Sequence, residues 1–108
     1  VHQIMVNKRQ QGTTFLTHIH HRQTPMRIVE GVSDAGVTWQ SEVKFQERIG
    51  NPIEGVQIPP KYNTTGIYAA GVITDAPHPE AAEEWVKFLS TETAQSIYRS
   101  YGFGIPGQ

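Results

Sequence analysis

The chain has 108 residues, with nine Lys and Arg, ten Asp and Glu, no cysteine and a formal net charge of −1 at pH 7. This balance gives no positive field for nucleic acid or an anionic membrane, and the absence of cysteine excludes disulfides and thiolate metal sites. No apolar run reaches the roughly 18–20 residues of a membrane span, and residues 1–11 lack the apolar region of a signal peptide. We expect no nucleic-acid partner, no membrane insertion and a single domain over residues 1–108.

The N-terminal third combines helical and β-prone patterns. Residues 1–11 carry apolar side chains at helical spacing, and residues 13–17 form a short β-prone run. Residues 24–31 predict a short helix that Thr24 can cap and that Gly31 ends, or one that starts a turn earlier, near His20. The order is therefore helix, strand, helix.

The middle of the chain continues this alternation. Residues 35–39 predict a buried strand, and residues 41–49 predict a helix that Ser41 caps. A strand over residues 55–58 stops at two prolines, because proline cannot donate a ladder hydrogen bond. Residues 67–73, the most apolar stretch, predict a further strand after a polar loop.

The C-terminal part is predicted to be a helical segment over about residues 78–103. Apolar residues recur at three and four positions after Pro79, which is typical of an amphipathic helix with proline near its start. Thr91 can cap a second helix that Gly102 ends. Helices interleaved with strands predict an α/β fold with a mixed, partly parallel sheet flanked by helices.

Four ordered stretches carry a family resemblance: residues 30–39 (EGVSDAGVTW), 68–73 (YAAGVI), 78–90 (HPEAAEEWVKFLS) and 94–103. Each motif alone is weak, but their order and spacing are specific. Together they resemble type II periplasmic solute-binding proteins of ABC transporters, close to the molybdate- and tungstate-binding members. The resemblance extends from about the first predicted strand to Pro106 and corresponds to the C-terminal half of a family member.

This resemblance implies one lobe of the periplasmic-binding-protein fold, with the N-terminal lobe outside this chain. It implies a ligand-capturing module, not an enzyme, with no cofactor and a periplasmic or extracellular location. The expected ligand is an oxyanion such as molybdate, or another small polar solute. The expected partner of the full-length protein is an ABC permease.

In the molybdate-binding relatives, neutral hydrogen-bond donors hold the anion, several of them backbone amides at helix starts. The resemblance places His21 at such a helix start and Trp39 where those relatives use a tyrosine. Trp39 offers an indole N–H but no hydroxyl, and it could instead fill a core at a strand end. The ligand-binding residues predicted in this way are His20, His21, Arg22, Trp39 and Tyr68.

The histidines allow a second interpretation, a metal site. His18 and His20 alternate onto one side of a strand, as metal ligands often do, and they resemble the Thr-His-x-His start of metallo-β-lactamase-type hydrolases. Those hydrolases continue with an aspartate and a histidine, whereas His21 and Arg22 follow here. A metal-dependent hydrolase is therefore the less favoured alternative.

The C-terminal helices suggest self-association. In the complete family they pack on the other lobe, so Trp85, Phe88, Leu89 and Tyr98 would lack their cover in this chain. Exposed apolar faces of this kind drive association, and we expect a homodimer, for example by exchange of these helices. A stand-alone interaction or regulatory domain that kept the fold without transport is the alternative function.

Overall fold

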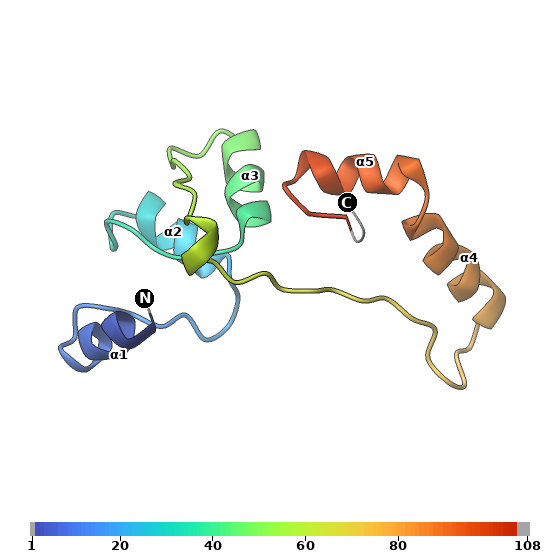
Figure 1. Ribbon diagram of the computed structural model, residues 1–108, viewed down its shortest axis with the longest axis horizontal. Coiled ribbons are helices and arrows are strands. Elements are labelled where there is room, and N and C mark those ends of the chain that lie inside the picture. Colours follow the sequence, from blue (N-terminus) through green and yellow to red (C-terminus); the bar gives the residue numbers. More distant parts are fainter. Residues whose placement is uncertain (1, 106–108) are drawn as a thin grey trace. The chain divides into compact units, whose positions relative to one another are not determined.

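The computed structural model describes residues 2–105 (Figure 1). The elements in chain order are α1 (His2–Gln10), α2 (Gln23–Val29), α3 (Gln40–Arg48), the 3-10 helix η1 (Pro60–Tyr62), α4 (Pro79–Leu89) and α5 (Glu92–Ser100). The chain forms two compact units, Val1–Thr64 and Thr65–Gln108. The first unit contains α1, α2, α3 and η1, and the second contains α4 and α5.

Helix α2 forms where the sequence predicts a short helix, and it begins at Gln23, between the two predicted starts. Pro25 lies in its first turn, where a missing N–H costs nothing, and its side chain is buried. Gly31 ends the helix with a φ of +70°, a conformation that glycine adopts without a steric penalty. The amides of Val32 and Ser33 then donate to the carbonyl of Arg27.

Helix α3 also forms as predicted, but its start differs in detail. Trp39, not Ser41, is the residue before the helix, and its extended backbone lets its carbonyl accept from the amides of Glu42 and Val43 at 3.0 and 3.2 Å. No side chain caps this helix start. The predicted capping role of Ser41 is therefore wrong.

The second unit contains the two predicted C-terminal helices. Pro79 is the first residue of α4, where its fixed φ suits helix initiation. The hydroxyl of Thr91 accepts from the amide of Ala94 and so caps α5, and Gly102 ends the helix region with a φ of +81°. Ala94 is the one fully buried apolar residue of this helix pair.

The predicted mixed sheet is absent from the described residues, which are helical and otherwise extended or turning, with no strand between residues 2 and 105. The α/β expectation is therefore wrong for this chain. The four β-prone runs, residues 13–17, 35–39, 55–58 and 67–73, are extended but are not paired into a ladder. Figure 1 shows the last of them as part of a long extended segment that leads to α4.

A β-prone run becomes a strand only when a neighbouring run satisfies its backbone groups, and strand propensity mainly reflects packing on a sheet. These apolar runs are largely exposed: Val56 is 87% and Ile67 is 91% accessible to solvent. Composition and alternation predicted strands in these runs, and none forms between residues 2 and 105. They could not show that each run lies without a β partner.

Two of the extended runs lie against helices, and glycine permits the close approach. A methyl group at Gly36 would lie 2.3 Å from the Cγ2 atom of Thr24, and one at Gly55 would lie 2.5 Å from the Cγ1 atom of Val43. Both distances are shorter than van der Waals contact. The runs over residues 35–39 and 55–58 therefore pack against α2 and α3, respectively.

Few side chains are fully buried in the described part of the chain, and those between α2 and α3 are mostly polar. Glu42 and Gln46 are 3% and 1% exposed, and Pro25 is the fully buried apolar residue nearby. Helices α2 and α3 contact each other, as do α4 and α5. Among the described helices, none combines the length and apolar character needed to cross a membrane.

Candidate functional site

A buried carboxylate organises the turn before α2. The two oxygens of Glu42, on the inner face of α3, receive different partners: Oε2 lies 3.0 Å from Nε2 of His21, and Oε1 lies 3.1 Å from Nε of Arg22. Gln46, one turn further along α3, donates from Nε2 to the same Oε1 atom at 2.7 Å. Glu42 therefore ties two of the predicted ligand-binding residues to α3.

A second layer fixes this carboxylate. The side-chain oxygen of Gln46 accepts a hydrogen bond from the side-chain amide Nδ2 of Asn51, just after α3. Gln46 can therefore present its own amide to Glu42 in only one orientation. No buried side-chain nitrogen or oxygen in the described residues is without a partner. The network is complete around the buried carboxylate, which is the condition under which a buried charge is tolerated.

Arg22 is held on two sides. Its Nε atom bonds to Glu42, and its guanidinium lies over the ring of Phe45 at 4.4 Å from the ring centre. A cation over an aromatic face gains about 0.5–2 kcal/mol, depending on exposure. The side chain remains 48% exposed. Among residues 2–105 no hydrogen bond to its terminal Nη groups is recorded, so these donors are available to a ligand.

The environment keeps Glu42 ionised. Burial of the carboxyl acts to raise its pKa, but hydrogen bonds from Gln46 and Arg22, the positive charge of Arg22 and, when His21 is protonated, the charge of His21 outweigh burial. Together they lower the pKa of Glu42 below its ordinary value of 4.5. The group is therefore a carboxylate, an acceptor only, at neutral pH.

The backbone amides at this turn already donate hydrogen bonds within the protein. The amide of Arg22 donates to Nδ1 of His20 at 3.1 Å. The amides of Gln23 and Thr24 donate to the carbonyls of His20 and His21 at 3.0 and 3.2 Å. Capture of a ligand at this turn would therefore depend on side chains more than on the amides that the family resemblance suggested.

The predicted ligand-binding residues divide between the two units. His20 and His21 lie together, with ring centres 4.1 Å apart, and Arg22 shares Glu42 with His21. Trp39 belongs to the same unit and follows Thr38, whose hydroxyl is 3.4 Å from the carbonyl of His21. Four of the five predicted residues are thus in one unit.

Tyr68 is in the other unit. It is 69% exposed, and its ring meets the edge of Phe103 at 6.1 Å between centres. Contacts join His20, His21 and Arg22 at the turn before α2, and Trp39 is in the same unit. The structure does not place Tyr68 with them.

The alternative metal site at His18 and His20 gains no further ligands from the described residues. No group of three or more His, Cys, Asp or Glu side chains in the described residues is arranged to hold a metal ion. His20 uses its Nδ1 atom to accept from the amide of Arg22, and His18 is exposed on the preceding segment. The contact with the amide of Arg22 gives His20 a structural role at the turn.

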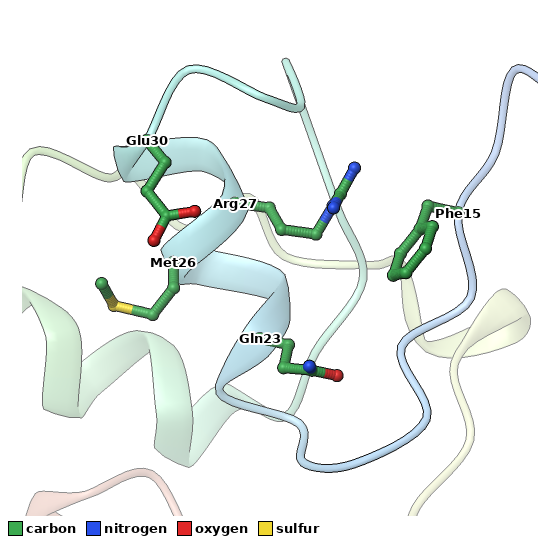
Figure 2. A pocket seen from close by; sticks show the side chains of 5 residues that line it. All are labelled: Phe15, Gln23, Met26, Arg27 and Glu30. Atoms are coloured by element: carbon green, nitrogen blue, oxygen red, sulfur yellow. The ribbon is translucent and has the colours of Figure 1, made fainter.

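A separate hollow of about 240 Å³ lies on another side of α2. Figure 2 shows Gln23, Met26, Arg27 and Glu30 on the helix, with the Arg27 side chain extending toward Phe15. The guanidinium is 4.1 Å from the centre of the Phe15 ring. This contact fastens the segment of Phe15 to α2, and Arg27 also donates to Ser33 at 3.2 Å.

Glu42 and Gln46 are the important residues that the sequence alone did not reveal. Both occupy positions on α3 where a charged or amide side chain is ordinarily exposed. One signal was present in the sequence: Glu42 and Gln46 are four residues apart, so their side chains lie on the same face of the helix. Only the packing of α2 on α3 shows that this face is buried.

Comparison with known proteins completes the description of the site. No protein of curated function and no solved structure matches this sequence. A protein-family model described as bacterial extracellular solute-binding protein matches residues 2–104, nearly the whole chain. The match includes the turn of His20 to Arg22, both α2 and α3, and the C-terminal helices. This chain therefore belongs to the bacterial extracellular solute-binding protein family.

Proposed function

We propose that this chain captures a small polar solute, such as an oxyanion, at the turn before α2. The observation that carries the proposal is the state of Arg22: Glu42 and Phe45 hold its guanidinium, yet the side chain is 48% exposed with free terminal donors. A preorganised guanidinium loses little conformational entropy when it binds oxygen atoms in a forked geometry. His20, His21 and Trp39 complete the proposed site.

The family membership supports a place in solute uptake. We infer that the chain acts outside the cytoplasmic membrane, in the periplasm or at the cell surface, and that the full-length protein delivers its solute to an ABC permease. Solute-binding proteins generally retain their ligand unchanged, and we propose a non-enzymatic role for this chain.

A ligand panel tests the proposal directly. A solute that binds only the folded state raises the midpoint of thermal unfolding by mass action. We expect at least one solute among molybdate, tungstate, sulfate, phosphate and small hydroxy acids to raise this midpoint. The increase should disappear in Arg22→Ala and persist in Arg9→Ala, which removes an exposed arginine from α1 in the same unit.

Arg22→Ala also removes a partner of Glu42 and so changes the midpoint of unfolding without ligand. The comparison between variants therefore uses the increase in midpoint that the ligand causes. Trp39→Phe keeps an aromatic ring and removes the indole N–H, and we expect it to weaken binding. A panel in which no solute shifts the wild-type midpoint, confirmed by isothermal titration calorimetry, would contradict the proposed capture.

We also propose that two copies associate through the helices of the second unit. Trp85 and Phe88 stack with ring centres 5.6 Å apart on α4 and are 59% and 41% exposed. Ile97 of α5 is 53% exposed. Adjacent large apolar groups at this exposure support burial against a second copy.

A further inference from the structure

The geometry around Glu42 fixes which nitrogen of His21 carries hydrogen. A carboxylate oxygen can only accept, and Oε2 of Glu42 lies 3.0 Å from Nε2 of His21. The Nε2 atom must therefore donate. In a neutral imidazole the other nitrogen, Nδ1, is then an acceptor.

The remaining acceptor belongs to a partly exposed side chain. The His21 side chain is 41% exposed, and within residues 2–105 no donor bonds to its Nδ1 atom. Arg22, bound to the other oxygen of the same carboxylate, offers its terminal donors nearby. One buried carboxylate thus holds an acceptor and a set of donors side by side.

This arrangement has chemical consequences for selectivity. The charge of Arg22 is matched one to one by Glu42, so with His21 neutral the group has no net charge. A ligand oxygen without hydrogen would meet the Nδ1 lone pair, and neither group could donate. A site built to bind a ligand hydroxyl discriminates against the analogue that lacks it, because its own polar group is then left unpaired.

Resting on the proposed function, we propose that Glu42 is the positioning residue that sets ligand specificity through His21. The site selects a solute that carries both acceptor oxygens and an adjacent O–H donor, such as a hydrogen-bearing oxyanion or a hydroxy acid. The acceptor oxygens bind Arg22, and the O–H group donates to Nδ1 of His21. A fully deprotonated oxyanion such as sulfate or molybdate binds less well.

An isosteric substitution reverses the proposed tautomer. In Glu42→Gln the side-chain oxygen stays where Arg22 and Gln46 both donate, as they do to Oε1 of Glu42. The new NH₂ group then faces His21, whose Nε2 atom must accept. The hydrogen moves to Nδ1, which becomes a donor to the ligand.

Hydrogen phosphate and sulfate are the probes, since both are tetrahedral dianions at about pH 8. Only hydrogen phosphate carries an O–H group. We expect the wild-type protein to bind hydrogen phosphate about tenfold or more tightly than sulfate, by calorimetry. In Glu42→Gln this ratio should fall to one or reverse.

Long-range proton–nitrogen correlation spectra of the histidines provide a readout that does not need ligand. His21 is assigned by the signal lost in His21→Asn. It should show the Nε2–H pattern in the wild type and the Nδ1–H pattern in Glu42→Gln. Glu47→Gln is the matched control, because Glu47 is on the same helix but pairs with Lys44 at the surface. Neither its spectrum nor its ligand ratio should change.

The outcomes separate the two proposals. If no solute of the full panel, molybdate and tungstate included, binds the wild type, the proposed function is overturned, and the proposed specificity is overturned with it. If solutes bind but the ratio or the His21 pattern is the same in the wild type and Glu42→Gln, only the role of Glu42 is overturned. A reversal of both readouts establishes Glu42 as the residue that sets specificity.

Discussion

Nε2 of His21 lies 3.0 Å from Oε2 of Glu42, and this contact joins the turn before α2 to the buried face of α3. The His21 side chain is 41% exposed to solvent, whereas the Glu42 side chain is 2% exposed. The pair therefore connects a solvent-facing residue to the interior of its unit. Changes at Glu42 should affect both stability and ligand binding.

Glu42→Ala should destabilise the first unit. The substitution leaves Gln46 without an acceptor and separates His21 and Arg22 from α3. Breaking such a network costs about 1–3 kcal/mol, toward the lower end because the His21 and Arg22 side chains are half-exposed. Urea unfolding followed by circular dichroism measures the change. Glu47→Ala should stay within about 0.5 kcal/mol of the wild type, and an equal loss in both variants would contradict a special role for Glu42.

Stability should fall in acid, and part of the fall should depend on Glu42. Because its folded pKa is below the ordinary value of 4.5, its contribution is present above that value and is lost as pH decreases through the folded pKa. The free energy of unfolding is measured by urea titration at a series of pH values. Glu42→Gln should flatten the decrease below pH 4.5, and an unchanged slope would show that other carboxyl groups account for it.

Gly36→Ala should destabilise the packing of residues 35–39 on α2. Its new methyl group would lie 2.3 Å from Cγ2 of Thr24, and overpacking of this kind costs about 1–3 kcal/mol. Thr24→Ser removes that Cγ2 atom, so the double variant should recover part of the loss. Unfolding energies of the four proteins in this cycle give the coupling between the two sites.

Gly71→Ala serves as the control, since a methyl group there meets no atom within 4 Å. Its unfolding energy should be close to that of the wild type. Additive effects of Gly36→Ala and Thr24→Ser would show that the close approach is not maintained in solution.

The double substitution Trp85→Ala with Phe88→Ala should weaken self-association. Both rings are large, adjacent and exposed on α4, and large aromatic residues contribute most of the free energy at many interfaces. Sedimentation velocity should show a dimer for the wild type and a dissociation constant raised at least about tenfold for the variant. Glu83→Ala, also on α4, should leave the dimer unchanged. A wild-type protein that sediments as a monomer would contradict the proposed homodimer.

Local sequence signals predicted the helices well because capping and stop residues act over short distances. Gly31 and Gly102 end their helices with positive φ, Thr91 caps α5, and Pro79 starts α4. Ser41 was a wrong choice of cap, since Trp39 supplies the helix start through its backbone alone. The choice between these two depends on the direction from which the chain enters the helix.

Local signals could not show that the predicted sheet does not form in residues 2–105, because strand pairing depends on two segments at once. Residues 67–73 have the composition of a buried strand, yet Ile67 and Ile73 are 91% and 73% exposed. Likewise, the sequence identified His21 and Arg22 as candidates, but not the carboxylate that holds them. Glu42 looks like a surface residue of an amphipathic helix until α2 is packed against it.

The extended, solvent-exposed segment around Ile67 and Ile73 also has consequences for proteolysis. A protease needs an extended substrate backbone, which this segment already presents, so limited digestion should cut here before it cuts the helices. The products would be one fragment with α2 and α3 and another with α4 and α5. Each could then be studied for the task proposed for it, solute capture by the first and self-association by the second.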